Sequence, residues 1–318
     1  MKKCLIVLWY GKFPNYFDFF LKSCEWNPGW DWMIYTDQEI TGLQVPSNVK
    51  FVSSCFSDMK RFIADKLEIK LFNKITPYKL CDIKPLYGKI FSSELERGGY
   101  SYWGHCDIDV IWGDLSKFYP DALIEQYDRF LCWGHLTLYR NTKDNNEFYK
   151  KACFKYFDYR AIIASKYVWG FDEYRKYALL RIQERESGYR IYKDRQAIAD
   201  VSPWDGYKNN KGMEHGKGVE LKPIEYVRVD KGSIYIKYLS ENSEMEMAYA
   251  HFQKRMFDIL PIKDKSQYYI LSNTFCSDKD YKGREIIKSD NRAVNIKFTQ
   301  LCKIFEVFWM RLDGILSK

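Results

Sequence analysis

Residues 103–115 read Trp-Gly-His-Cys-Asp-Ile-Asp-Val-Ile-Trp-Gly-Asp-Leu, an apolar segment with Asp107 and Asp109 near its centre. The run from Tyr100 to His105 predicts a strand in the middle of a sheet, which ends at the first aspartate. Two carboxylates two residues apart can both point into one cleft where the chain turns after a strand. Ligands of open α/β sheets bind outside the carboxyl ends of the strands, so this position indicates a binding site.

Strand and helix patterns alternate before this segment. Residues 3–10 form a continuous apolar run, which is typical of a strand covered on both faces. Gly98-Gly99 ends the last helix before the central strand. The expected elements are strands at residues 3–10, 31–37 and 49–52 and helices at residues 14–25, 57–71 and 78–96. Their order predicts an α/β fold with a mixed, mostly parallel sheet flanked by helices.

The pattern is looser after residue 128. Lys231-Gly232 divides an alternating segment and predicts a hairpin, and the end of the chain is more basic with helical spacing. The expected elements are one or two strands at 129–140, helices at 144–157 and 171–186, a mobile loop at 205–218, a hairpin at 226–238 and a last short strand at 248–252. We expect a main domain over residues 1–258 and a helical C-terminal extension over residues 259–318.

Composition limits the possible partners. Hydrophobic residues make up 46% of the chain, enough for a sizeable core, and the 18% of aromatic residues offer stacking surfaces for sugars and bases as well as core packing. The net charge of +8 suits an anionic small substrate or an anionic membrane surface. The basic residues are scattered and match no nucleic-acid-binding motif, so we expect no nucleic-acid partner.

The cysteines and the apolar runs predict a cytoplasmic location. Nine cysteines without a C-x-x-C pair or a secretory signal favour a reducing compartment, and no apolar run is long enough to span a membrane. Apolar residues at helical spacing from Phe298 to Leu316 predict a C-terminal helix. This helix could make peripheral contact with the inner face of the cell membrane, or pack against its own domain or a partner subunit.

The two aspartates are candidate metal ligands. Their hard oxygens suit Mg²⁺ or Mn²⁺, and such an ion can bridge a diphosphate. His251, one of four histidines, stands 142 residues after Asp109 (251 − 109) in the expected last strand. A neutral imidazole facing two carboxylates is a suitable third ligand. The alternatives are a solvated or capping aspartate pair and a buried structural histidine.

The order of three motifs resembles the core of GT-A glycosyltransferases. A helix over 78–87 carries Asp82 and Lys84, then Gly98-Gly99-Tyr100 follows, and the D-x-D closes the next strand. The chain is similar to a family of bacterial glycosyltransferase-like proteins from surface polysaccharide gene clusters. The similarity covers roughly residues 1–255, and the block 78–115 is its most specific part.

The resemblance implies a GT-A-type, Rossmann-like domain that uses Mn²⁺ or Mg²⁺ and a nucleotide-sugar donor, with UDP as the expected nucleotide. Asp107 and Asp109 would bind the metal, the diphosphate and the donor ribose, and Asp82 would bind hydroxyls of the donor sugar. Lys84 would hold the phosphates, but relatives commonly have arginine here, and lysine cannot make the same bidentate fork. An N-cap role for Asp82 and a solvated Lys84 are the alternatives.

The resemblance also implies a nucleoside site at the ends of the first two strands. Tyr10 would stack on the base and Asp37 would bind the base or ribose edge, with a core aromatic and a turn-forming aspartate as the alternatives. His251 would complete the metal site. Lys254 and Arg255 would neutralise the diphosphate leaving group.

The catalytic group is less well defined. Inversion needs a carboxylate that deprotonates the acceptor hydroxyl, and retention needs a group that stabilises the other face of the sugar. Asp172 and Glu173, which follow Trp169-Gly170-Phe171, are the first candidates, and Asp194 is the rival; Asp172 could equally be a helix N-cap. His135 and Asn141 are expected to line the acceptor side. Both stereochemical outcomes remain open.

These expectations favour a glycosyltransferase that acts on a bacterial surface glycan, such as capsule, O-antigen or lipooligosaccharide, with a glycan or lipid-linked glycan as acceptor. A nucleotidyltransferase is an alternative, but its usual Gly-rich basic loop is replaced after the first strand by Trp9-Tyr10-Gly11-Lys12-Phe13-Pro14. A non-catalytic glycan-binding protein is a further alternative. It would not need Asp107 and Asp109 together with His251.

Overall fold

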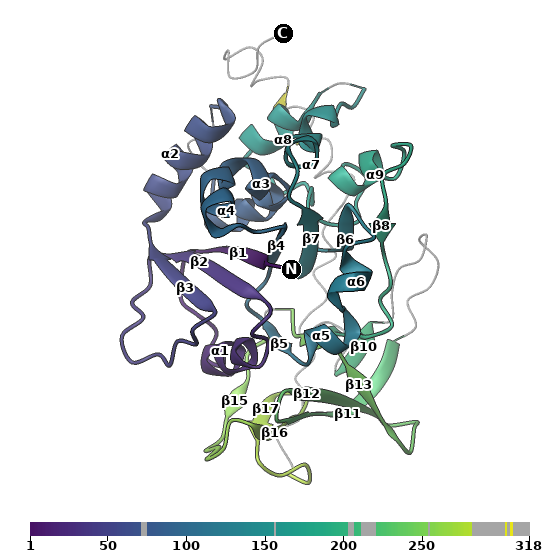
Figure 1. Ribbon diagram of the computed structural model, residues 1–318. Helices are drawn as coiled ribbons and strands as arrows, with labels where there is room; N and C mark the ends of the chain where they lie inside the picture. Colours follow the sequence, from purple (N-terminus) through teal and green to yellow (C-terminus); the bar gives the residue numbers. More distant parts are fainter. Residues whose placement is uncertain are drawn as a thin grey trace.

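Asp107 and Asp109 lie in the connection between two strands that belong to different β-sheets. In the computed structural model, β4 (Tyr102–Cys106) belongs to a seven-stranded sheet and β5 (Val110–Trp112) to a ten-stranded sheet (Figure 1). The structure describes residues 1–70, 75–155, 157–202, 207–210, 221–253, 255–281, 303, 306 and 307. The molecule is a mixed α/β protein in which helices flank sheets of mixed strand direction, as the sequence predicts at this level.

The seven-stranded sheet has the order β3-β2-β1-β4-β7-β6-β8. Four of its six strand pairings are parallel, and β7 runs antiparallel to both β4 and β6. Because β1 to β4 are parallel, their carboxyl ends meet at one edge of the sheet. Besides β4, the strands are β1 (Lys3–Trp9), β2 (Asp31–Thr36), β3 (Val49–Ser53), β6 (Arg129–Trp133), β7 (Leu136–Arg140) and β8 (Ile191–Tyr192). The strands expected at 3–10, 31–37 and 49–52 and within 129–140 are confirmed.

Helix α1 (Phe17–Glu25) joins the two sheets. Phe17 and Phe20 pack in one apolar cluster with residues of β1 and β2, whereas Phe19 packs in another with residues of the ten-stranded sheet. On the other side of the first sheet, α2 (Phe56–Leu67) contributes Met59, Ile63 and Leu67 to a third apolar cluster. Packing on both faces explains why β1 is a continuous apolar run.

Three expected helices are shorter than predicted. The segment 78–96 is divided into the 3₁₀ helix η1 (Pro77–Leu86), α3 (Tyr87–Ile90) and α4 (Ser92–Gly98), because Pro85 has no amide N–H to continue an α-helix. Gly99 ends α4 with a φ of 64°, as expected. The segment 144–157 is helical only in α7 (Lys143–Asn146) and η2 (Phe148–Lys151).

The expected helix over 171–186 is reduced to α9 (Leu179–Gln183). The first part of the segment is irregular. Asp172 is 2% exposed and lies beside the Lys84 ammonium, whereas in an amphipathic surface helix an aspartate would face the solvent. The remaining short helices are α5 (Leu115–Phe118), α6 (Asp121–Ile124) and α8 (Tyr159–Ala164).

The ten-stranded sheet is mostly antiparallel and includes the expected hairpin. β11 and β12 pair across Lys231 and Gly232, whose positive φ angles of 47° and 91° suit a two-residue hairpin turn. The expected strand at 248–252 is confirmed as β14. Besides β5, the strands are β9 (Ile198–Ser202), β10 (Lys208–Asn210), β11 (Leu221–Asp230), β12 (Ser233–Tyr238), β13 (Glu244–Met247), β14 (Tyr249–His251), β15 (Asp258–Ile259), β16 (Gln267–Ile270) and β17 (Thr274–Cys276).

The prediction of a helical chain from residue 259 onward is wrong for the part that forms β16 and β17. Tyr268, Ile270 and Phe275 are buried against α1 and β11, which gives this stretch the alternation of a strand. Farther on, Lys303, Glu306 and Val307 are helical. Val307 is 4% exposed, and the Glu306 carboxylate accepts hydrogen bonds from the Ser165 hydroxyl and the Lys166 amide, so these tail residues pack against their own chain.

Two further expectations concern a loop and the membrane. Of the expected mobile loop at 205–218, only residues 207–210 are described, and three of them form β10. Among the described residues, no helix is both long enough and apolar enough to cross a bilayer.

Candidate functional site

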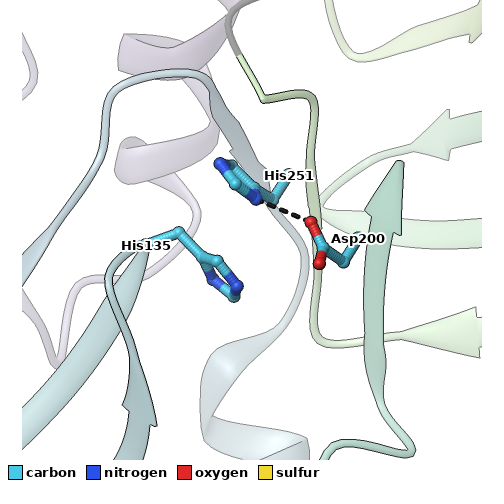
Figure 2. A group of neighbouring side chains, drawn as sticks. All are labelled: His135, Asp200 and His251. Carbon is cyan, nitrogen blue, oxygen red and sulfur yellow. Dashed lines mark hydrogen bonds and ion pairs between the residues drawn. The ribbon is translucent and has the colours of Figure 1, made fainter. Parts of the chain in front are cut away.

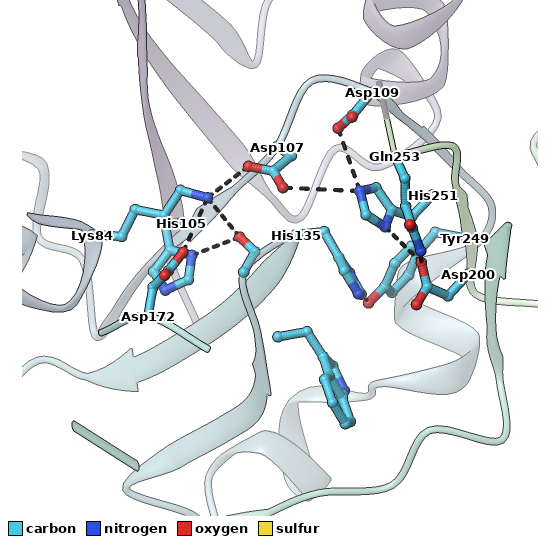
Figure 3. Close-up of polar contacts among 12 residues, drawn as sticks. Lys84, His105, Asp107, Asp109, His135, Asp172, Asp200, Tyr249, His251 and Gln253 are labelled. Atoms are coloured by element: carbon cyan, nitrogen blue, oxygen red, sulfur yellow. Dashed lines mark hydrogen bonds and ion pairs between the residues drawn. The ribbon is translucent and has the colours of Figure 1, made fainter. Parts of the chain in front are cut away.

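The D-x-D segment and His251 meet between the two sheets (Figure 3). β14 pairs antiparallel with β5, so His251 lies opposite Val110 and next to the D-x-D. The His251 Nε2 atom is 3.5 Å from Asp109 Oδ1 and 3.9 Å from Asp107 Oδ2. One ligand atom from each residue lies within 4.8 Å of the others. The structure therefore brings the three predicted metal ligands together.

This cluster has a buried side and a more exposed side. The side chains of Asp109 and His251 are 7% and 10% exposed, whereas that of Asp107 is 34% exposed. Asp107 follows β4, and the carboxyl ends of the parallel strands β1 and β2 reach the same edge of the sheet. A ligand could thus reach the cluster over Asp107, from the sheet edge where α/β proteins bind their ligands.

The carboxylates control the charge of His251. Burial alone would lower the pKa of the imidazole, but Asp109 and Asp200 outweigh burial and raise the pKa of His251 to about 10. Burial would raise the pKa of Asp200, but its hydrogen bond and attraction to His251 hold it below its usual value. Without a cation, His251 is therefore an imidazolium that balances the carboxylates, and a metal ion would replace its proton.

A second, fully buried layer lies behind His251 (Figure 2). The His251 Nδ1 atom is 2.9 Å from Asp200 Oδ1, and the His135 ring lies 4.3 Å from the His251 ring, centroid to centroid. His135 is hydrogen-bonded through Nδ1 to the Tyr249 hydroxyl at 2.9 Å, and burial lowers its pKa. We expected His135 on the acceptor side, but the structure places it in this layer.

His135, Asp200 and His251 also have the spacing of a metal site. Asp200, however, already accepts from the Gln253 amide at 2.6 Å and from the Arg195 guanidinium. A cation on these oxygens would lie beside a guanidinium, which repels it. Of the two sets that share His251, the one with Asp107 and Asp109 is the better cation site.

Lys84 connects the D-x-D to Asp172 (Figure 3). Its ammonium donates to Asp107 Oδ1 at 2.6 Å and to the Gly134 carbonyl at 2.9 Å, and it lies 3.5 Å from Asp172 Oδ2. Burial opposes the charge on Lys84, but Asp107 and Asp172 outweigh it and raise the pKa of Lys84. The Lys84 ammonium thus joins Asp107, a predicted metal ligand, to Asp172, a predicted catalytic residue.

Asp172 is the predicted catalytic residue that lies nearest to this cluster. Burial raises the pKa of its carboxyl to about 8, although Lys84 opposes the shift. Its Oδ1 atom has no hydrogen-bond partner among the described residues. Glu173 instead pairs with Arg175 at 2.7 Å, and the exposed Asp194 accepts from the Gln196 amide and the Tyr192 hydroxyl. Glu173 and Asp194 are not part of the cluster.

Asp82 lies in a closed ion pair instead of an open site. Its Oδ2 accepts from the Lys79 ammonium at 2.7 Å and from the Trp169 amide at 2.8 Å, and its Oδ1 accepts from the Phe171 amide at 2.8 Å. Asp82 and Lys79 are both 0% exposed. Asp82 also has metal-like spacing with Cys81 and Asp172, but its oxygens already have these partners. Because Asp82 is fully buried and both of its oxygens accept hydrogen bonds, it cannot bind the hydroxyls of a sugar. Asp82 instead holds the loop before Asp172.

The predicted nucleoside residues lie at the ends of β1 and β2. The Gly11 amide donates to Asp37 at 3.3 Å, which ties the two strand ends together, and Asp37 is exposed. The Tyr10 ring packs against Phe56, with ring centroids 5.3 Å apart, so one part of it is a core contact. Both residues share the sheet edge with Asp107.

Of the remaining candidates, Arg255 and Asn141 are not in the cluster. Lys254 lies outside the described residues. Arg255 donates to the Ser272 carbonyl at 2.8 Å. Asn141 donates to the Tyr100 carbonyl at the opposite end of β4, so the expected place on the acceptor side is wrong for this residue.

The sequence reasoning missed Asp200. It lies in β9, opposite His251 in a parallel pairing, and is 5% exposed. The sequence feature that could have indicated Asp200 is its place inside the apolar run Ala197 to Val201. Buried carboxylates need a partner, so such an aspartate indicates a nearby donor or cation.

Comparison with known proteins gives a family but no activity. Residues 5–279 match a family of unknown function, DUF6625, and because the match spans most of the chain, the protein belongs to this family. No curated protein matched the chain. No solved structure matched it either.

Proposed function

We propose that this protein is a metal-dependent glycosyltransferase of the GT-A type that transfers a sugar from a nucleotide-sugar, with UDP as the nucleotide. The observation that carries the proposal is the meeting of Asp107, Asp109 and His251 Nε2 within 4.8 Å, at the carboxyl edge of parallel strands. Residues 142 positions apart (251 − 109) converge there, and one side of the cluster is open.

The three side chains fit a divalent cation. Carboxylate oxygens with one imidazole suit Mn²⁺, and Mg²⁺ to a lesser degree. The Asp200 carboxylate behind His251 is the support that metal-bound imidazoles usually have. A cation held here would supply positive charge for the diphosphate of the donor and its leaving group.

The sheet edge offers a place for the rest of the donor. Tyr10 and Asp37 lie on it beside the metal site, and we assign them to the nucleoside. Lys84 already contacts Asp107 and is close enough to the cluster to add positive charge on the phosphate side. We do not include Asp82, because its oxygens are occupied.

Asp172 is the carboxyl that we assign to the transfer step. It lies across Lys84 from Asp107 and has an oxygen without a hydrogen-bond partner among the described residues. Because burial raises its pKa to about 8, Asp172 is protonated in most molecules at pH 7, and its ionised form, whose share grows as the pH rises toward 8, is the one that accepts the proton of an acceptor hydroxyl. We carry the bacterial surface glycan over as acceptor from the sequence resemblance, and the cytoplasmic face of the membrane as location from the cysteines and the apolar C-terminal segment.

The test is nucleotide binding with and without metal. We expect Mn²⁺ plus UDP to raise the melting temperature of the wild type by several degrees, because a ligand that binds only the folded state stabilises it. UDP without metal should have little effect. Asp109→Asn should abolish the response, and Asp144→Asn, which changes an exposed aspartate of α7 at the opposite end of the sheet, should retain it. A wild type that responds to no nucleoside diphosphate would contradict the proposal.

A further inference from the structure

We infer that Asp200 is a positioning residue, which holds the His251 imidazole so that its Nε2 atom faces the cation between Asp107 and Asp109. The inference rests on the proposed metal site and adds a residue that lies outside the D-x-D motif. Of the three predicted metal ligands, His251 is the one that is hydrogen-bonded to Asp200.

The hydrogen bond between Asp200 and His251 sets the orientation of the ring. An ionised carboxylate only accepts hydrogen bonds, so the Nδ1 atom, 2.9 Å from Asp200 Oδ1, must carry a proton. Nε2 is then the ring nitrogen that can bind a metal, and it is the one that lies near Asp109 and Asp107. A flipped ring would place carbon atoms where the nitrogens are now.

Asp200 is itself held from three directions. The Gln253 amide donates to Oδ1 at 2.6 Å, and the Arg195 guanidinium donates to Oδ2. The Asp200 amide donates to Asn209 Oδ1 at 2.8 Å. The carboxylate therefore has little freedom to turn away from His251.

Backbone strain next to His251 supports the same conclusion. Gln253 has a φ of 48°, in the left-handed region that residues other than glycine rarely adopt, and this conformation is typical of functional sites. The turn that it makes directly after β14 brings its side chain back to Asp200. The strained residue is thus also one of the residues that fix the carboxylate.

The His135 ring completes the support. It lies 4.3 Å from the His251 ring, centroid to centroid, and is held by a hydrogen bond with the Tyr249 hydroxyl. With Asp200 on one ring nitrogen and His135 against the ring, the imidazole has one nitrogen left to offer to the D-x-D side.

The test combines metal affinity with a signal from the histidine proton itself. In wild-type protein without metal, the proton on Nδ1 of His251 should give a downfield, slowly exchanging NMR resonance in a ¹⁵N-histidine-labelled sample. Asp200→Asn should lose this resonance and bind Mn²⁺ about 10 to 100 times more weakly by calorimetry, the usual effect of removing such a partner. Asp144→Asn, which changes an exposed aspartate of α7, is the matched control and should behave as the wild type.

A second variant protects the test against misfolding. Gln253→Gly removes one donor to Asp200 and relieves the positive φ, so it should fold and should weaken Mn²⁺ binding by a smaller factor, about two- to fivefold. An unchanged resonance and unchanged Mn²⁺ affinity in Asp200→Asn would overturn the inference and leave the proposed function standing. A wild type that binds no Mn²⁺ would overturn the proposed metal site, and the resonance would then decide alone whether Asp200 orients His251.

Discussion

Two aspartate centres lie on either side of Lys84 in the sequence and differ in what their oxygens contact. Asp82 is sealed: both of its oxygens accept hydrogen bonds from Lys79 and two loop amides, and neither Asp82 nor Lys79 is exposed. In the cluster of Asp107, Asp109 and His251, carboxylates face an imidazole, and Asp107 is about one-third exposed. The first arrangement is complete within the chain, whereas the second gathers negative charge on an accessible side.

The comparison distinguishes a buried ion pair that stabilises the fold from a cluster of carboxylates that has the features of a binding site. A buried carboxylate whose hydrogen bonds are all satisfied holds its neighbours in place and has nothing left to offer a ligand. Carboxylates placed close together repel each other and lower stability, so such a cluster is expected at functional sites. The resemblance to glycosyltransferases implies a donor-binding role for both centres, and the proposed function assigns that role to the D-x-D alone because Asp82 is sealed.

The largest effect is expected from breaking the sealed centre. Asp82→Ala leaves the Lys79 ammonium buried without its carboxylate and frees the amides of Trp169 and Phe171. Loss of one partner of a buried ion pair costs about 3–5 kcal/mol, so the free energy of unfolding measured with urea should fall by that amount. Asp107→Ala, the matched change in the open centre, should alter it by about 1 kcal/mol or less, because Asp107 is about one-third exposed. Equal losses in the two variants would remove the distinction between the centres.

A smaller effect is expected from the pH dependence of the free energy of unfolding, through the carboxyl of Asp172. Burial raises the pKa of Asp172 to about 8, so folding takes up a proton between the pKa of the unfolded chain, near 4, and 8. The stability contributed by this proton is complete below pH 4 and is lost as the pH rises to 8, with a slope of at most about 1.4 kcal/mol per pH unit. Asp172→Asn should flatten the difference between urea-unfolding curves measured at pH 5 and pH 8. An identical pH dependence in the variant would show that Asp172 is ionised in the folded protein.

Local patterns predicted part of this molecule well. The strands β1, β2 and β4 follow from apolar segments, the D-x-D from two carboxylates at a strand end, and His251 from the resemblance to GT-A glycosyltransferases. The register of β5 with β14, which brings His251 to the D-x-D, cannot be derived from either segment alone. The sequence therefore identified the candidate ligands but not their distances.

The failures share a physical cause. Asp82 accepts hydrogen bonds from the backbone amides of Trp169 and Phe171, which lie 87 and 89 residues away. The sequence around Asp82 therefore could not predict that these amides seal its carboxylate. Asp172 turns inward to Lys84 and ends the helical pattern that its own segment displays. Residues 267–276 include β16 and β17, whose Tyr268 and Phe275 pack against Phe19 of α1. In each case a tertiary contact outweighs a local preference.

The central claim is that Asp107, Asp109 and His251 hold one divalent cation. Its most direct test is pulsed electron paramagnetic resonance of Mn²⁺ added to the wild-type protein and to His251→Gln. The account predicts echo modulation from one directly bound imidazole nitrogen in the wild type, and its loss together with weaker Mn²⁺ binding in the variant. Bound Mn²⁺ without a nitrogen ligand, or a nitrogen signal that persists in His251→Gln, would contradict it.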